Sequence, residues 1–259
     1  MSTDNLPATT DSLPVAYGAE TGTLPPERVE AMFDRIARPY DVMNRVMTAG
    51  LDVRWRKLAA DATEVGAGAS VLDCCCGTAD LSLELGRRVG PSGEVIGIDF
   101  SNGMLDIGRR KVVKKGMDQV TLLHGDALDL PFEDDRFAAA TVAFGIRNVA
   151  DLLQGLTELR RVVRPGGKVV CLEITTPESG PLARFHRLWF DRLVPAVGKV
   201  ADRKGDSAYT YLPASVKRFP GPTPLAHVMY EAGLRDVRFR TLGGGIVALH
   251  VGTVEGERG

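Results

Sequence analysis

The chain has 259 residues, and its 32 lysines and arginines nearly balance 33 aspartates and glutamates, for a net charge of -1. This length favours a single α/β domain with added helices over two domains, and it allows a large core. The balanced charge argues against a general nucleic-acid-binding protein, which needs a basic surplus. No apolar run approaches the roughly 18 residues of a spanning helix, and no charged-then-apolar leader is present. We therefore expect a cytoplasmic protein.

The first sixty residues predict an arm followed by two helices. Residues 1–26 are rich in Thr, Ser, Pro and Gly without apolar periodicity, so we expect a disordered arm before a single domain of residues 27–259. From Glu27 onward apolar residues fall at helical spacing, and Pro39 is expected to end this helix. A second helix should carry residues 53–58. Taken alone, the aromatic rings of Tyr40 and Trp55 fit packing roles in these helices.

Residues 70–80, SVLDCCCGTAD, are the stretch around which the remaining pattern is organised. A short apolar run ends in the acid Asp73, and a helical pattern begins at about Thr78, so the segment reads as strand, tight turn and helix. Gly77 permits the turn and lets a ligand approach the backbone closely. The N–H groups at the start of the helix would face that ligand. We therefore expect Asp73, Gly77 and Thr78 to contact a cofactor.

A second apolar run, Glu94–Asp99, also ends in an acid, and Asp99 is expected to accept hydrogen bonds from both ribose hydroxyls of an adenosine. A nicotinamide dehydrogenase uses the same pair of strands, so the glycine pattern must discriminate. A dinucleotide fingerprint needs three glycines to pass a pyrophosphate. Residues 77–80 hold one glycine and end in Asp80, which would repel phosphate. The sequence therefore predicts S-adenosylmethionine, with its cationic end attracted to Asp73 and Asp80.

The third strand leads to another candidate cofactor contact. Residues 120–124 form an apolar run that Asp126 and Ala127 follow closely. An acid at that strand end commonly meets the adenine amino group, and a turn-forming aspartate is the alternative. Between the second and third strands, Ser101 is expected to cap a helix that runs to Lys115.

The fourth strand, residues 137–144, brings the candidate catalytic residues. It includes Ala143, a further expected cofactor contact, and Arg147 and Asn148 follow it. Ligands of open α/β sheets bind outside the carboxyl ends of the strands, so these two side chains are placed for chemistry. A structural salt bridge from Arg147 to Glu173 or Asp151 is the alternative.

The rest of the chain completes the fold class. We expect a helix over residues 151–163, a turn over 164–167, a fifth strand over 168–173, a helix over 223–232 and a hairpin of strands 237–242 and 246–251. Five βα units closed by an antiparallel hairpin form the seven-stranded doubly wound, Rossmann-like fold of class I S-adenosylmethionine-dependent methyltransferases. Residues 182–200 place apolar residues at helical spacing between arginines and lysines, which fits a core helix, a helical lid over an apolar substrate or a membrane-surface helix.

The four cysteines point to packing. Cys74, Cys75 and Cys76 are consecutive, so an extended chain cannot turn all three toward one metal, and no CxxC or paired histidine accompanies them. We expect no metal site. A reactive thiol beside the cofactor is the alternative to small buried residues.

Several motifs together resemble the ubiquinone/menaquinone biosynthesis C-methyltransferases. The resemblance covers roughly residues 33–252. It rests on YDVMN (residues 40–44) followed by Gly50 and Trp55, FGIRN (144–148), RVVRPGGKVVCLE (161–173), YTYLPASV (209–216) and GGIVALH (244–250). The chain departs from the family pattern at four positions: Thr48 and Thr175 replace serine, Asp52 replaces histidine, and Ala79 replaces glycine.

The resemblance implies methylation of a ring carbon of a prenylated quinol, with demethylmenaquinol converted to menaquinol in menaquinone biosynthesis. It places Tyr40, Arg147 and Asn148 around the ring, and Arg147 would stabilise the phenolate and help to hold a water. The prenyl tail implies peripheral contact with the inner face of the membrane. Benzoquinol methylation in ubiquinone biosynthesis, methylation of another small aromatic compound, a non-catalytic partner protein and a homodimer stay open. A nucleic-acid methyltransferase would need an Asn/Asp-Pro-Pro-aromatic loop and a basic face, and the sequence has neither.

Overall fold

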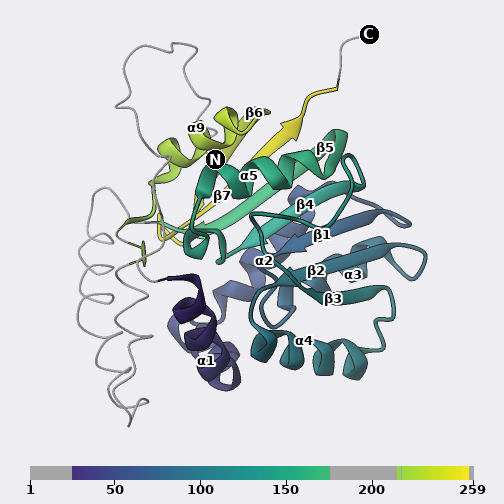
Figure 1. The fold of residues 1–259 in the computed structure, drawn as a ribbon, viewed down its shortest axis with the longest axis vertical. Coiled ribbons are helices and arrows are strands. Elements are labelled where there is room, and N and C mark those ends of the chain that lie inside the picture. The colour runs from purple at the N-terminus through teal and green to yellow at the C-terminus, as the bar shows by residue number, and fades with distance from the viewer. Residues whose placement is uncertain (1–24, 176–214, 217, 257–259) are drawn as a thin grey trace.

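A seven-stranded sheet runs through the middle of the molecule in the computed structural model, which describes residues 25–175, 215–216 and 218–256 (Figure 1). Its strands are β1 (Ser70–Cys74), β2 (Glu94–Asp99), β3 (Val120–His124), β4 (Phe137–Ala143), β5 (Val163–Ile174), β6 (Leu234–Leu242) and β7 (Val247–Val254). They lie in the order β3-β2-β1-β4-β5-β7-β6. The strands β1 to β5 pair in parallel, and β7 is antiparallel to both β5 and β6. This topology confirms the predicted doubly wound sheet closed by a hairpin.

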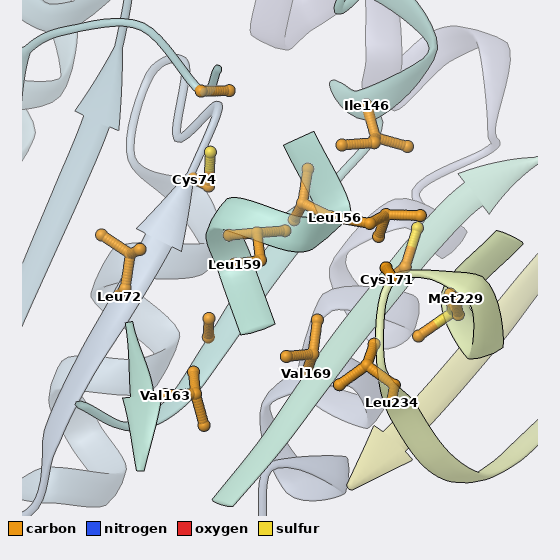
Figure 2. Packing of buried hydrophobic residues seen from close by; sticks show 14 of the residues in the cluster. Leu72, Cys74, Ile146, Leu156, Leu159, Val163, Val169, Cys171, Met229 and Leu234 are labelled. Carbon is orange, nitrogen blue, oxygen red and sulfur yellow. The ribbon is translucent and has the colours of Figure 1, made fainter. Parts of the chain in front are cut away.

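Helices cover both faces of the sheet (Figure 1). They are α1 (Pro26–Met47), α2 (Leu51–Ala62), α3 (Asp80–Val89), α4 (Asn102–Lys115), the one-turn η1 (Ile146–Asn148), α5 (Leu152–Arg161) and α9 (Pro222–Glu231). Successive strand residues point to opposite faces, so Leu72 packs in the cluster under α5 and α9, while Val71 packs in the cluster under α2 and α3. Figure 2 shows the first cluster, in which Leu156 and Leu159 of α5 lie over the sheet. The core therefore has two layers that hold the strand ends in fixed positions.

The predicted end of the first helix at Pro39 is wrong. The helix α1 continues through Pro39 to Met47. A proline inside a helix removes one backbone hydrogen bond and costs roughly 3 kcal/mol. Contacts on both sides of it offset this cost: Phe33 packs edge-on against Phe100, and Asp41 accepts a hydrogen bond from Thr78. The continuous helix extends α1 along the carboxyl edge of the sheet.

The predicted turn at residues 164–167 is an interruption of β5. Val163 already pairs with Phe137, and the next register pair joins Lys168 to Ala139. The partner strand advances two residues while β5 advances five, so the intervening residues bulge out of the ladder. Gly166 has φ +78° there, a left-handed conformation that glycine adopts without strain. The strand therefore begins earlier than expected and contains the residues that were predicted to form a turn.

Other boundaries follow the sequence closely. Ser101 caps α4, because its hydroxyl accepts a hydrogen bond from the Met104 N–H at 3.2 Å. The expected disordered arm and the expected helix at residues 182–200 lie outside the described residues, apart from the last two residues of the arm. Among the described helices, none is long and apolar enough to cross a membrane.

Candidate active site

A cleft opens at the carboxyl ends of β1, β2 and β4. Its empty space amounts to about 570 Å³, the space open to solvent included. Loop residues after the three strands form its floor, and α1 and α2 supply one wall. The described residues that line it are Phe33, Tyr40, Arg56, Asp73, Cys75, Cys76, Gly77, Thr78, Asp80, Leu81, Asp99, Phe100, Met104, Ala143, Phe144, Gly145 and Asn148.

Asp99, at the end of β2, is fixed against the turn that follows β1. Its Oδ2 accepts a hydrogen bond from the Gly77 N–H at 2.8 Å, and its Oδ1 accepts one from the Ser101 N–H at 2.9 Å. An ionised carboxylate has about four lone-pair sites, so the side chain retains capacity for two hydroxyl donors. Burial raises the pKa of Asp99 to about 6, and the two backbone N–H groups oppose this shift.

The turn itself leaves space for a ligand. Gly77 has φ +54°, and a Cβ placed on it would meet no atom of the described residues within 4 Å. The next glycine of the cleft, Gly145, has the opposite environment, because a Cβ there would lie 2.3 Å from the Cβ of Cys75. Gly145 thus lets the loop after β4 approach the loop after β1. An open backbone cradle beside an oriented carboxylate fits the ribose of an adenosine.

Asp73, at the end of β1, is more enclosed than the sequence suggested. Its carboxylate accepts hydrogen bonds from the hydroxyls of Ser82 at 2.6 Å and Thr141 at 2.9 Å. Only 1% of the residue is exposed, and burial raises its pKa to about 6. Asp73 therefore lines the cleft with a negative charge that is held in place by two hydroxyl donors.

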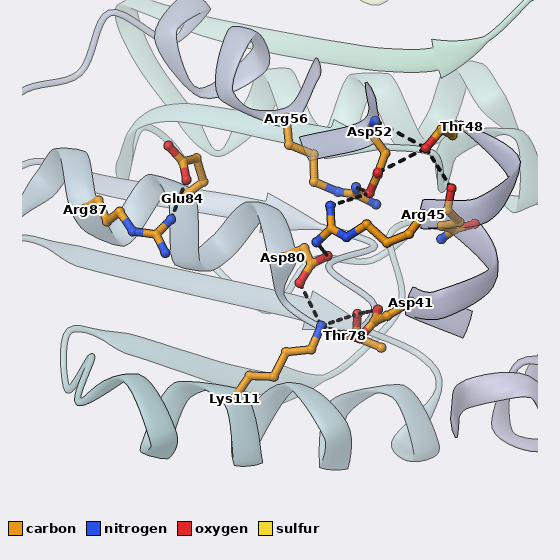
Figure 3. A network of polar contacts seen from close by, with 11 residues as sticks. Asp41, Arg45, Thr48, Asp52, Arg56, Thr78, Asp80, Glu84, Arg87 and Lys111 are labelled. Carbon is orange, nitrogen blue, oxygen red and sulfur yellow. Dashed lines mark hydrogen bonds and ion pairs between the residues drawn. The ribbon is translucent and has the colours of Figure 1, made fainter. Parts of the chain in front are cut away.

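Ion pairs tie α1 to the segment that follows β1, at Thr78 and Asp80, as Figure 3 shows. The Lys111 Nζ lies 2.6 Å from Asp41 Oδ2 and 2.7 Å from Asp80 Oδ1, and it also contacts the Thr78 hydroxyl at 3.0 Å. Arg45 reaches Asp80 from the other side at 3.3 Å. Two cations thus neutralise much of the charge of Asp80, which weakens the attraction that the sequence analysis expected between Asp80 and a cationic ligand.

Asp52, which the sequence analysis singled out as a departure, belongs to the same network of ion pairs. Its Oδ2 accepts hydrogen bonds from Arg56 at 2.5 Å and from Arg45 at 3.0 Å, and its Oδ1 accepts one from the Thr48 hydroxyl at 3.0 Å (Figure 3). Burial of Asp52 opposes its ionisation, but the charges of Arg56 and Arg45 hold its pKa below the ordinary value. The acid at this position is therefore an ion-pair partner of two arginines.

The two residues expected after β4 have different surroundings. Asn148 lines the cleft, and its Oδ1 is buried without a hydrogen-bond partner among the described residues. Arg147 is not among the described lining residues. Its Nη1 lies 2.6 Å from Glu173 Oε1 and also donates to the carbonyl of Phe144. The salt bridge that was the structural alternative for Arg147 is thus present, and its catalytic role stays a prediction.

The expected adenine contacts lie beside the cleft. Asp126 is exposed, and its Oδ1 accepts a hydrogen bond from the Leu128 N–H at 2.9 Å, the turn geometry named above as its alternative role. Ala127 is buried against the core. Neither is among the described lining residues, so their contact with adenine also stays a prediction.

The aromatic residues divide between cleft and core. Tyr40 lines the cleft and packs edge-on against Phe33, with ring centroids 6.3 Å apart. Trp55 is only 3% exposed and packs against Phe144, which is the packing role that the sequence analysis expected. Of the expected contacts, Thr78 and Ala143 also lie in the lining.

The four cysteines are unpaired thiols, and two of them line the cleft. Cys74 and Cys171 are buried in the core, while Cys75 and Cys76 line the cleft. Burial, together with neighbouring acids and thiols, raises the pKa of Cys76 well above its ordinary value. Among the described residues, no three His, Cys, Asp or Glu side chains gather in a way that could hold a metal ion.

Several lining residues were not predicted as site residues, among them Arg56, Phe100, Met104 and Gly145. Phe100 directly follows β2 and Gly145 is the second residue after β4, so the rule that ligands bind at strand ends could have found them. Met104 is one turn into α4, and it reads as an ordinary core residue. Arg56 comes from α2, which precedes the sheet, and no spacing in the sequence signals that it returns to the cleft.

Comparison with known proteins identifies the group to which this site belongs. The model of the ubiE/COQ5 methyltransferase family matches residues 22–254. The demethylmenaquinone methyltransferases of Bacillus velezensis and Bacillus subtilis are 43% and 42% identical over 226 residues, which cover 87% of this chain and 97% of each relative.

A solved structure supports the fold independently. The possible histamine N-methyltransferase of Thermotoga maritima superposes with a TM-score of 0.61 at 17% identity, covering 86% of this chain and 98% of that one. This likeness concerns the fold alone. The family assignment rests on the sequence match, which includes the strand-end acids and the loop after β4 described above. The chain belongs to the ubiE/COQ5 methyltransferase family.

Proposed function

We propose that the protein transfers a methyl group from S-adenosylmethionine to a ring carbon of a prenylated quinol, with demethylmenaquinol as the substrate. The observation that carries the substrate class is the match to relatives named demethylmenaquinone methyltransferase, which extends over 97% of their length. The cleft supports the proposal because residues suited to the cofactor and residues suited to a phenol line the same cavity.

The residues present fit the cofactor. Asp99 retains acceptor sites for two ribose hydroxyls, and the space above Gly77 is open. Phe100 and Met104 offer apolar surfaces for adenine on the side of α4. When bound, S-adenosylmethionine supplies a methyl group on a positively charged sulfur. The negative charge of Asp73 favours a cationic ligand over an anionic one.

The chemistry asks the protein for alignment, exclusion of water and removal of a phenol proton. A ring carbon becomes nucleophilic when the neighbouring hydroxyl loses its proton, so a general base or a base-activated water is needed. Tyr40 and Asn148 line the cleft and can hydrogen-bond to the ring oxygen or to that water. The unpartnered Oδ1 of Asn148 can accept a hydrogen bond from a phenol or a water.

Arg147 is proposed to stabilise the phenolate, while Glu173 orients its guanidinium. An arginine stays charged at any working pH, so it cannot serve as the base. The Glu173 contact engages Nη1. A charge-assisted hydrogen bond from the guanidinium to the ring oxygen would strengthen as the phenol ionises.

The prenyl tail needs an apolar surface, and we assign it to residues 182–197 on the strength of the sequence pattern alone. Apolar residues at helical spacing, interleaved with basic ones, also suit peripheral contact with a membrane. Replacing Trp189 and Phe190 together by alanine should raise KM for a long-tailed quinol far more than for a short-tailed one. Equal effects on both substrates would remove this assignment.

Quinone profiling tests the proposed substrate in the cell. A strain that lacks this gene should accumulate the demethyl form of its naphthoquinone, and the chain should restore the methylated form. An accumulated benzoquinone precursor would replace the proposed substrate by its ubiquinone counterpart. A strain with an unchanged quinone pool would contradict the function.

A further inference from the structure

The cleft has a cationic side chain for which the account above gives no role. Among the described lining residues, Arg56 is the only lysine or arginine. It is 8% exposed, although arginine is rarely buried to this extent without full pairing. Its ion pair with Asp52 accounts for its burial, and the question is whether the guanidinium can also bind a second anion in the cleft.

The hydrogen bonds of Arg56 leave most of its guanidinium available. Its Nη1 donates to Asp52, and its Cζ lies 5.3 Å from the centre of the Phe144 ring. A guanidinium has five N–H donors, and no other described residue accepts a hydrogen bond from Arg56. Asp52 and Phe144 thus hold the group from one edge and one face, and they leave other donors for a ligand in the cleft.

The local charge also favours an added anion. Asp52 is shared by two guanidiniums, those of Arg56 and Arg45. Arg45 has a second carboxylate, Asp80, at 3.3 Å, and Lys111 likewise contacts two carboxylates. Among the described residues Arg56 contacts one carboxylate, whereas Arg45 and Lys111 each contact two (Figure 3).

The position of Arg56 along the cleft identifies the part of the ligand that it meets. The ribose is assigned to Asp99 at the end of β2, and Arg56 contacts Phe144 after β4, with β1 between these two strands. In S-adenosylmethionine the ribose lies between the adenine and the amino acid. If the adenine lies toward Phe100 and Met104, the amino acid would extend across β1 toward Arg56.

We propose that Arg56 binds the carboxylate of the amino-acid end of S-adenosylmethionine, and that Asp52 is the positioning residue that orients it. This inference rests on the proposed function for its ligand. Asp73 lies near enough for the charge of Arg56 to lower its pKa against the effect of burial. Asp73 and Arg56 thus present one anion and one cation to the cleft, which match the ammonium and the carboxylate of an amino acid.

The test compares two ligands that differ only in this carboxylate. Calorimetry measures the dissociation constants of S-adenosylmethionine and of decarboxylated S-adenosylmethionine for each variant, and their ratio reports the carboxylate contact. The native protein should bind the complete ligand about tenfold to a hundredfold more tightly, the effect of a hydrogen-bonded charge pair. Arg56→Gln should bring the ratio close to one, and Arg56→Lys should give an intermediate value because lysine lacks the planar fork.

Arg45→Gln is the matched control. Arg45 also pairs with Asp52, but it is not among the described residues that line the cleft, so this variant should keep the native ratio. An equal loss of the ratio in both variants, or a native ratio in Arg56→Gln, would overturn the assignment to Arg56. If Arg56→Gln does not fold, the test compares the ratio of dissociation constants in the native protein with that in Arg56→Lys. Equal ratios would overturn the inference. A native protein that binds neither ligand would overturn the proposed function as well.

Discussion

The Gly77 N–H donates a hydrogen bond to Asp99 Oδ2 at 2.8 Å, so the turn after β1 and the acid after β2 are one structural unit. The two residues belong to separate sequence motifs. Their hydrogen bond sets the direction of the carboxylate and shapes the turn at the same time. A change at Asp99 should therefore affect both the ligand and the turn.

Replacing Asp99 by alanine should weaken binding of S-adenosylmethionine by about 1.5–3 kcal/mol, the range for hydrogen bonds to a charged group. Calorimetry on the folded variant measures the loss. Asp106→Asn is the control, because Asp106 lies on α4 with an exposed side chain and pairs only with Arg109 in the described structure. Unchanged affinity in Asp99→Ala would remove Asp99 from the cofactor site.

The buried negative charge of Asp73 should lower the free energy of unfolding at pH values above 6. Its pKa is raised to about 6 in the folded protein, against an ordinary value of 3.8. Between these values the folded state binds more protons than the unfolded state, so the free energy of unfolding falls as pH rises. This rise in the pKa of Asp73 lowers the free energy of unfolding by at most about 3 kcal/mol at pH 7.5.

Asp73→Asn removes this penalty and keeps a polar group beside Ser82 and Thr141. The variant should be more stable than the native protein in urea at pH 7.5, and the difference should vanish near pH 3.5. It should also bind the cationic cofactor less tightly. A variant that is less stable at pH 7.5 would show that the ionised carboxylate strengthens the fold.

The effects of replacing Arg147 and Glu173 on stability should depend on each other because the two residues form a buried ion pair. Their effects on turnover should differ. Glu173 is 1% exposed, and burial raises its pKa even though Arg147 opposes this. Removing one partner of a buried ion pair typically costs about 3–5 kcal/mol. Arg147→Gln should therefore lower stability, and adding Glu173→Gln should restore part of it.

Turnover separates the two roles of Arg147. The double variant should bind S-adenosylmethionine normally and lose about two orders of magnitude in kcat, as when one oxyanion-hole donor is removed. Glu173→Gln alone keeps the guanidinium and should retain more activity. If the double variant turned over at the native rate, Arg147 would have only its structural role.

Lys111 should hold α1 against the cofactor turn. Its contacts with Asp41 and Asp80 are partly exposed, and such pairs contribute up to about 1 kcal/mol each. Lys111→Met should speed hydrogen exchange in α1 and weaken cofactor binding about fivefold, more so at low salt. Lys114→Met, an exposed position on the same helix, is the control. Identical exchange in both variants would show that apolar contacts alone hold α1.

Local patterns predicted the sheet because each relevant signal lies within a few residues. The acid-ended apolar runs gave β1 and β2, and the serine before α4 gave its cap. The continuation of α1 through Pro39 was missed because its compensating contacts come from Thr78 and Phe100, far away in the sequence. Distance along the sequence also hid the place of Arg56 in the cleft, whose other lining residues mostly follow the strands, whereas its ion pair with Asp52 is a local i, i+4 contact within α2.

The most direct measurement is methyl transfer by the purified protein. S-adenosylmethionine with a labelled methyl group is incubated with demethylmenaquinol, and mass spectrometry with fragmentation locates the label. The account predicts one labelled methyl group on a ring carbon, formed only when protein and both substrates are present. A folded protein that binds S-adenosylmethionine and leaves this quinol unlabelled, or labels its oxygen, would contradict the account.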